Sequence, residues 1–137
     1  MSRVINPNAV GKERDQLVKA VVAALRELAG QATIGLPTRD LTAFVVLALE
    51  AIAVAIDPSV QAWEKRGYWV KADRFRMDWM WTGQLAKELR EALLSEDWAR
   101  VALLSAKIGG KLSAVKIPVR HRIGRPWVGA WKKLKEG

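Results

Sequence analysis

The stretch from Leu41 to Ile56, LTAFVVLALEAIAVAI, constrains the fold more than any other part of the chain. Its sixteen residues are largely apolar on every side of a helix, and Glu50 is the only charged residue among them. A helix that crosses a bilayer needs about 20 apolar residues, so this run falls short of a membrane span. In a soluble protein, a helix that is apolar all round is surrounded by other helices. We therefore expect this run to form the centre of the fold.

Apolar residues at helical spacing predict the neighbours of this central helix. They recur every three or four positions from Leu17 to Leu28, which indicates a surface helix with one buried stripe. The same spacing continues from Tyr68 to Leu93 and predicts one long helix, kinked near Gly67 or Gly83.

Capping residues predict where several helices begin and end. Thr38 is expected to cap the central helix, and Asp57 is expected to cap another with Pro58 at its first position. A further helix is expected to begin at Ser95, Glu96 and Asp97 and to end at the Gly109-Gly110 pair.

The chain after Lys111 has a different character. Pro118, Gly124, Pro126 and Gly129 interrupt any long helix, although a short helix or turn is expected around residues 131–135. With 137 residues, of which 50% are hydrophobic and 27% charged, the chain has the size and composition of one globular domain. The predicted fold is all-α: a small bundle of about four to five helices in a core domain of residues 1–111. Residues 112–137 are predicted to be an irregular, basic segment with tryptophans, packed on or extending from the same domain.

Composition excludes several kinds of chemistry. The chain has no cysteine and a single histidine, which rules out disulfides, thiolate metal sites and multi-histidine sites. Asp73 is three residues from Arg76, and Asp78 is four residues from Arg74, so on a helix these acids form surface ion pairs rather than a catalytic pair. We predict no enzymatic activity, no cofactor and no metal. The absence of a signal-peptide pattern predicts a cytoplasmic protein, and the scarcity of Asn and Gln predicts a thermophilic source.

The positive charge is concentrated near the C-terminus. The formal net charge is +9, yet residues 1–60 contribute zero and residues 61–105 contribute +1. Residues 106–137 hold nine basic residues against one acidic residue, a net charge of +8. Such a concentrated positive field attracts polyanions, and therefore predicts a nucleic acid or another acidic surface as the partner.

The basic segment also carries aromatic residues. Lysine and arginine neutralise phosphates, and tryptophan stacks on unpaired bases. The candidate nucleic-acid-binding residues here are Lys116, Arg120, His121, Arg122, Arg125, Trp127, Trp131, Lys132 and Lys133. The alternative interpretation is that Trp127 and Trp131 anchor the segment on the helices while the basic residues are simply solvated.

A second set of aromatic residues lies in WEKRGYWVKADRFRMDWMW, residues 63–81. Helical spacing places Tyr68, Phe75 and Trp79 on the buried stripe, where aromatic residues usually pack. Further candidate nucleic-acid contacts lie on the flank of this helix: Lys65, Trp69 and Arg76. Four apolar residues point in different directions and predict a turn that is covered all round, by the domain or by another copy: Met77, Trp79, Met80 and Trp81.

The leading functional hypothesis is a non-catalytic nucleic-acid-binding protein that mainly contacts the phosphate backbone, with tryptophan stacking on unpaired bases. The sequence does not distinguish between DNA and RNA, or between single and double strands, as the ligand. The alternative is a protein-interaction or oligomeric assembly subunit that uses the tryptophan-rich helix as its interface. Anionic membrane surfaces are a third hypothesis, disfavoured by the helix breakers in the basic segment.

Overall fold

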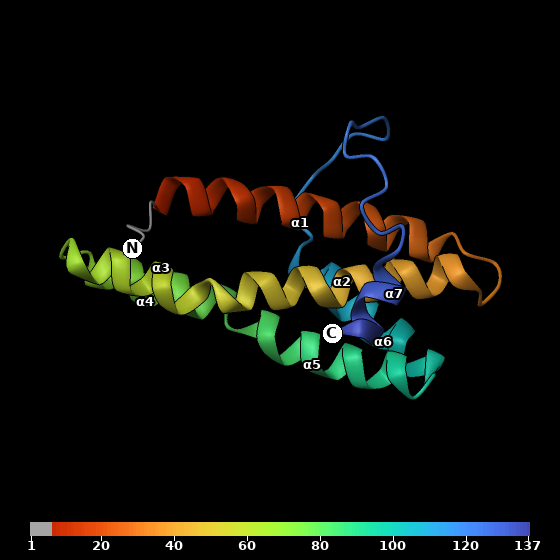
Figure 1. The fold of residues 1–137 in the computed structure, drawn as a ribbon. Helices are drawn as coiled ribbons and strands as arrows, with labels where there is room; N and C mark the ends of the chain where they lie inside the picture. Colours follow the sequence, from red (N-terminus) through yellow and green to blue (C-terminus); the bar gives the residue numbers. More distant parts are fainter. Residues whose placement is uncertain (1–6) are drawn as a thin grey trace.

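Helices are the only regular secondary structure in the part of the chain that the structure describes, which is residues 7–137, with side chains described from residue 11. In chain order the helices are α1 (Pro7–Ala29), α2 (Leu36–Val54), α3 (Ile56–Lys65), α4 (Trp69–Trp79), α5 (Trp81–Leu94), α6 (Trp98–Lys111) and α7 (Ala130–Glu136). The computed structural model has no strand in that range. The predicted fold class, an all-α small helical bundle, is confirmed (Figure 1).

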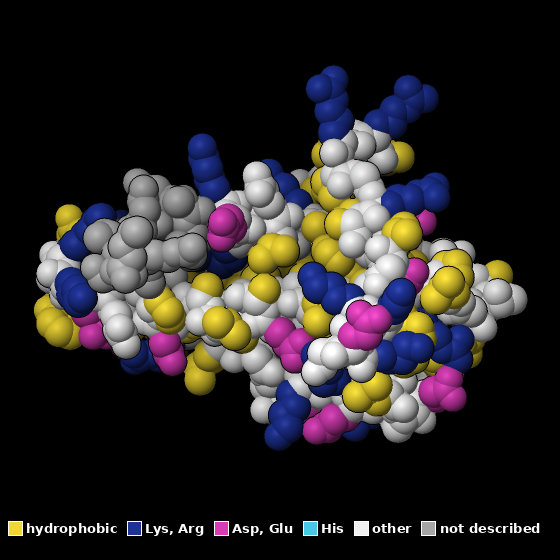
Figure 2. Space-filling view, in the orientation of Figure 1, with side chains coloured by type: hydrophobic (Ala, Val, Ile, Leu, Met, Phe, Trp, Pro, Cys, Tyr) yellow, Lys and Arg dark blue, Asp and Glu magenta, His cyan; other side chains and the backbone are white. Residues whose placement is uncertain are grey.

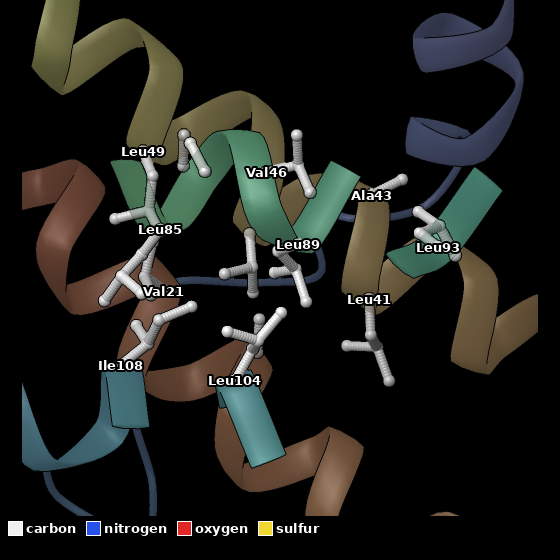
Figure 3. Packing of buried hydrophobic residues seen from close by; sticks show 14 of the residues in the cluster. Val21, Leu41, Ala43, Val46, Leu49, Leu85, Leu89, Leu93, Leu104 and Ile108 are labelled. Carbon is white, nitrogen blue, oxygen red and sulfur yellow. The ribbon is translucent and has the colours of Figure 1, made fainter. Parts of the chain in front are cut away.

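Helix α2 lies at the centre of the bundle, as the apolar run predicts. It packs against α1, α5 and α7, and Figure 1 shows it running between α1 and α5. Leu41, Val45, Val46 and Leu49 of this helix are fully buried. Figure 3 shows α2 side chains meeting leucines of α5 and α6 together with Val21 of α1. Each fully buried side chain of this size contributes roughly 1.5–3 kcal/mol, so packing around α2 is the main source of stability.

The two predicted caps of the central region are wrong. Helix α2 begins at Leu36 behind Gly35, so Thr38 lies inside its first turn, and the Thr38 hydroxyl donates to the Thr33 carbonyl at 2.8 Å. Helix α3 begins at Ile56 behind Ala55, so Asp57 is not the N-cap and lies in the first turn instead. Helix α2 begins three residues and helix α3 two residues earlier than expected, because the first turn needs no intrahelical donors and tolerates proline at several positions.

Helices α2 and α3 follow one another almost without interruption. Together they form the one stretch in the described residues, Leu36–Lys65, that is long and apolar enough to cross a membrane. Within its most apolar window of 18 residues, 44% of the residues are buried inside the fold. The core helix of a globular protein can be as long and as apolar as a membrane-spanning helix. The central position of α2 in the bundle accounts for its apolar composition.

The long helix predicted from Tyr68 to Leu93 is divided in two at Met80. Side chains hold the break: the Trp81 indole Nε1 donates to the Asp78 carbonyl at 2.9 Å, and the Thr82 hydroxyl donates to the Trp79 carbonyl at 2.7 Å. These bonds satisfy carbonyls that a helix end leaves free.

The predicted buried stripe of that region is largely present. Most of its members are buried or half-buried: Ala72, Phe75, Trp79, Thr82, Ala86, Leu89 and Leu93. Tyr68 is the exception, because it precedes α4 and is 51% exposed. Of the two glycines near which a kink was expected, Gly67 lies in the turn between α3 and α4 with a φ of 80°, whereas Gly83 lies inside α5 where this helix meets α2.

Helix α6 begins where the acidic residues predict it. The Asp97 carboxylate accepts a hydrogen bond from the Arg100 backbone N–H at 3.1 Å and so caps the helix. The helix continues through Gly109 and Gly110 to Lys111, beyond the expected end. The remaining chain folds back onto the core, where Trp127 and Leu134 belong to the same buried cluster as the helices before it.

Candidate nucleic-acid interface

The basic residues of the C-terminal region all lie on the surface. All nine basic residues between positions 106 and 137 are exposed: Lys107, Lys111, Lys116, Arg120, Arg122, Arg125, Lys132, Lys133 and Lys135. In the part of the chain that the structure describes, every ion pair is made by a basic residue before position 106. Figure 2 shows dark blue side chains standing out from the loop before α7 and lying over α7 itself. The C-terminal charge is therefore not neutralised within the fold.

A buried carboxylate fixes the start of α7. Asp40 of α2 is only 7% exposed, and its two carboxylate oxygens accept the Gly129 N–H at 3.2 Å and the Trp131 N–H at 2.9 Å. Gly129 has a φ of 85°, a left-handed conformation that glycine adopts without strain. The carboxylate thus caps a helix that is 89 positions away in sequence from it.

The structure corrects the assignment of Trp127 as a base-stacking residue. Its side chain is 8% exposed, and its ring packs edge-on against Phe44 of α2 with the centroids 6.4 Å apart. A base would have to displace the core to reach the faces of this indole. Trp127 therefore anchors the basic segment on the helices, as the alternative interpretation of the sequence proposed.

Trp131 occupies an intermediate position. Its indole is half-buried against the core, and the Lys135 ammonium lies 5.0 Å from the ring centroid, within cation–π range. Lys132 and Lys133 on the same helix are exposed. Helix α7 therefore presents three cations and one partly covered aromatic ring to solvent.

The loop between α6 and α7 is anchored on both sides and projects between the anchors. Ile117 and Ile123 pack partly buried against the core. The Arg26 guanidinium of α1 donates to the Ile117 and Pro118 carbonyls at 3.1 and 3.2 Å. Figure 1 shows the loop rising beyond α1. Its tip is closed by the Ile123 N–H, which donates to His121 Nδ1 at 3.3 Å.

The tip of this loop exposes charged residues. Arg120 and Arg122 are exposed on it, Lys116 and Arg125 are exposed on its two limbs, and His121 is half-buried. Val119 of this loop is also exposed, at 90%. The loop therefore carries four of the six predicted lysine and arginine contacts of the basic segment, and the other two lie on α7.

The second predicted set of contacts lies elsewhere. Lys65, Trp69 and Arg76 belong to α3 and α4, at the opposite end of the molecule from α7 in Figure 1. Lys65 is exposed and Trp69 is 64% exposed, whereas Arg76 lies 3.8 Å from Glu64 and 4.0 Å from Asp73. The predicted Asp73–Arg76 pair is therefore present, whereas the predicted pair between Asp78 and Arg74 is not found among the described residues. Lys65, Trp69 and Arg76 do not form one surface with the basic segment.

The four residues predicted to be covered all round behave in two ways. Trp79 and Trp81 pack partly buried against the core, whereas Met77 and Met80 are 69% and 63% exposed. The half of this turn that faces the domain is covered, and the half that faces away has no cover within the described residues.

An arginine from α1 holds α4 against the bundle. The Arg14 guanidinium lies 4.7 Å from the Phe75 ring centroid and 5.1 Å from that of Trp79. Partial burial lowers the pKa of Arg14, while nearby Asp15 raises it. This cation–π contact adds to the packing of Phe75 and Trp79 against Ile56 and Val60 of α3.

Two features of this surface have little or no signature in the sequence. Asp40 directly precedes the apolar run that begins at Leu41. A charged residue beside such a run is the one sequence feature that could have indicated a buried carboxylate with a structural role. An apolar groove between α1 and α6 has no signal in the sequence, because its walls come from segments far apart in the chain.

No group of three acidic or histidine side chains that could hold a metal ion occurs among the described residues.

Comparisons of the chain with protein-family models, with curated proteins and with solved structures found no match.

Proposed function

We propose that this protein is a non-catalytic nucleic-acid-binding protein that contacts the phosphate backbone through its C-terminal basic segment. The observation that supports this most is the set of nine exposed cations after position 105, with Glu136 as the only acidic residue among them. A field of this kind binds polyanions by releasing their counterions, without reading base sequence.

The placement of the aromatic residues makes stacking a minor contribution. Trp127 is buried, and Trp131 offers only the part of its ring that the core and Lys135 leave free. Arginines on the projecting loop and lysines on α7 instead present charge from two adjoining elements of the same segment. Backbone contacts of this type position a protein on nucleic acid and make affinity depend strongly on salt.

Removal of residues 112–137 is not a clean test, because it would also remove Trp127, Ala130 and Leu134 from the core. Neutralisation of exposed charges avoids this problem. The triple variant Arg120→Gln, Arg122→Gln, Arg125→Gln is expected to lower affinity for a labelled duplex and a labelled single strand. The slope of log affinity against log salt is expected to decrease by about 0.9 per lost phosphate contact for a duplex.

A matched control variant removes the same charge elsewhere. Lys12, Lys19 and Lys87 are exposed and lie outside the basic segment, so their joint replacement by Gln changes the net charge by the same amount. This control is expected to keep most of the affinity and the salt slope. Equal losses in the two variants would show that only total charge matters, and an absence of salt-dependent binding by the wild type would refute the proposal.

A second candidate function is assembly with another protein or another copy. Met77 and Met80 together with Tyr68, Trp69 and Val70 are each more than half exposed, although they are large and apolar. Clusters of exposed apolar residues commonly mark interaction surfaces. Sedimentation of the wild type and of Val70→Lys, Met80→Lys tests this: a concentration-dependent oligomer that the variant abolishes supports it, and a wild-type monomer excludes self-assembly.

A further inference from the structure

An apolar groove lies between the C-terminal half of α1, the connection from α1 to α2, and α6. Its volume is about 640 Å³, within the range of roughly 300–1,000 Å³ that is usual for small-molecule sites. Apolar side chains dominate the lining, including Leu25, Leu28, Ile34, Trp98 and Val101. A groove of this size and lining excludes sugars and other highly polar ligands, which need an array of hydrogen-bonding groups.

The polar groups of the groove are few, and most are already engaged. The Thr38 hydroxyl donates to the Thr33 carbonyl at 2.8 Å, and the Gln31 amide donates to the Glu27 carbonyl at 3.3 Å. The Ser105 hydroxyl is buried and has no partner in the part of the chain that the structure describes. A buried hydroxyl of this kind is costly to leave without a hydrogen bond.

Among the residues that the structure describes, Arg26 is the only charged one in the lining. Its guanidinium donates one hydrogen bond each to the carbonyls of Ile117 and Pro118, at 3.1 and 3.2 Å. A guanidinium has five N–H donors, so three are left for a ligand. No acidic residue lines the groove, so the charge of Arg26 is complementary to a ligand with one negative charge.

We propose that this groove binds a single-chain amphiphile with a monoanionic head group, such as a fatty carboxylate. The hydrocarbon chain lies along the walls formed by α1 and α6, and the carboxylate binds Arg26. This site is separate from the exposed charges that carry the proposed function, and nucleic-acid binding neither requires it nor tests it.

The two neighbouring glycines near the end of α6 provide a matched pair of variants. Gly109 lines the groove and Gly110 does not, and a Cβ atom added at either position would meet nothing within 4 Å. Both lie within α6, where leucine is a better helix former than glycine. Gly109→Leu therefore fills groove volume, whereas Gly110→Leu makes the same chemical change outside the groove, and both variants are expected to fold.

Isothermal titration with dodecanoate below its critical micelle concentration, in moderate salt to suppress binding to surface lysines, measures the site. We expect saturable binding of one dodecanoate per chain. Gly109→Leu is expected to weaken this binding about tenfold or more, because a change of one methylene in an apolar pocket already changes affinity roughly tenfold or more. Gly110→Leu is expected to leave the affinity unchanged. Thermal unfolding followed by circular dichroism verifies that each variant is folded.

Dodecanol tests the head group because it has the same chain without the charge. It is expected to bind the wild type about tenfold more weakly than dodecanoate, since a charge-assisted hydrogen bond is lost. Arg26→Gln is expected to remove most of this difference. The proposal is overturned by non-saturable binding, by equal weakening in both glycine variants, or by equal affinities of dodecanoate for the wild type and Arg26→Gln.

Discussion

Asp40→Ala is the substitution that most directly tests how the basic segment is held. The Asp40 carboxylate is buried and accepts the backbone N–H groups of Gly129 and Trp131 at the start of α7. Alanine removes both acceptors and leaves two donors without partners at the foot of the segment. The apolar contacts of Trp127, Ala130, Trp131 and Leu134 with the core then remain to hold this part of the chain in place.

The expected loss follows from these two hydrogen bonds. Each bond to a charged acceptor contributes about 1.5–3 kcal/mol. Removal of a buried carboxylate also removes its desolvation cost, which offsets part of the loss. We expect a net decrease of about 2–4 kcal/mol in the free energy of unfolding, a large share of the roughly 5–15 kcal/mol typical of a small domain. Asp40→Asn, which keeps one amide oxygen as an acceptor, is expected to lose about half as much.

Urea unfolding followed by circular dichroism measures this change, and hydrogen exchange at Gly129 and Trp131 shows whether α7 opens locally. Asp78→Ala is the control, because this exposed carboxylate carries the same charge and makes no hydrogen bond or ion pair among the described residues. A loss below about 0.5 kcal/mol for Asp40→Ala, the usual size of a surface substitution, would refute the role of this carboxylate.

Four further substitutions test the packing. Trp127→Ala is expected to lower stability by about 3–5 kcal/mol in urea unfolding, and Trp131→Ala by clearly less because this ring is only half-buried; similar losses would contradict the anchor assignment. Gly83→Ala is expected to raise the melting temperature, since an added Cβ would lie 3.5 Å from Ala53 and alanine favours the helix by roughly 0.5–1 kcal/mol. Arg14→Gln is expected to lower the free energy of unfolding by about 0.5–2 kcal/mol and to increase hydrogen exchange in α4, because the cation–π contacts with Phe75 and Trp79 are lost. Unchanged exchange in α4 would show that Arg14 does not hold this helix.

The details that local patterns failed to predict share one cause. The caps expected at Thr38 and Asp57 are wrong by three and two residues because several side chains in that region suit a first turn equally well. The predicted long helix breaks at Met80 because the side chains of Trp81 and Thr82 bond to carbonyls of the preceding turn. Such choices between competing hydrogen bonds depend on geometry that spacing alone does not contain.

The sequence by itself determined the all-α class, the central helix and the location of the excess charge. Apolar periodicity sets which faces must be buried, and a count of charges needs no coordinates. Only the tertiary structure decided that Trp127 is an anchor, that Asp40 caps α7 and that Lys65 and Trp69 lie far from the basic segment. These are contacts between residues distant in the chain, and they depend on how the helices pack rather than on the order of residues along any one of them.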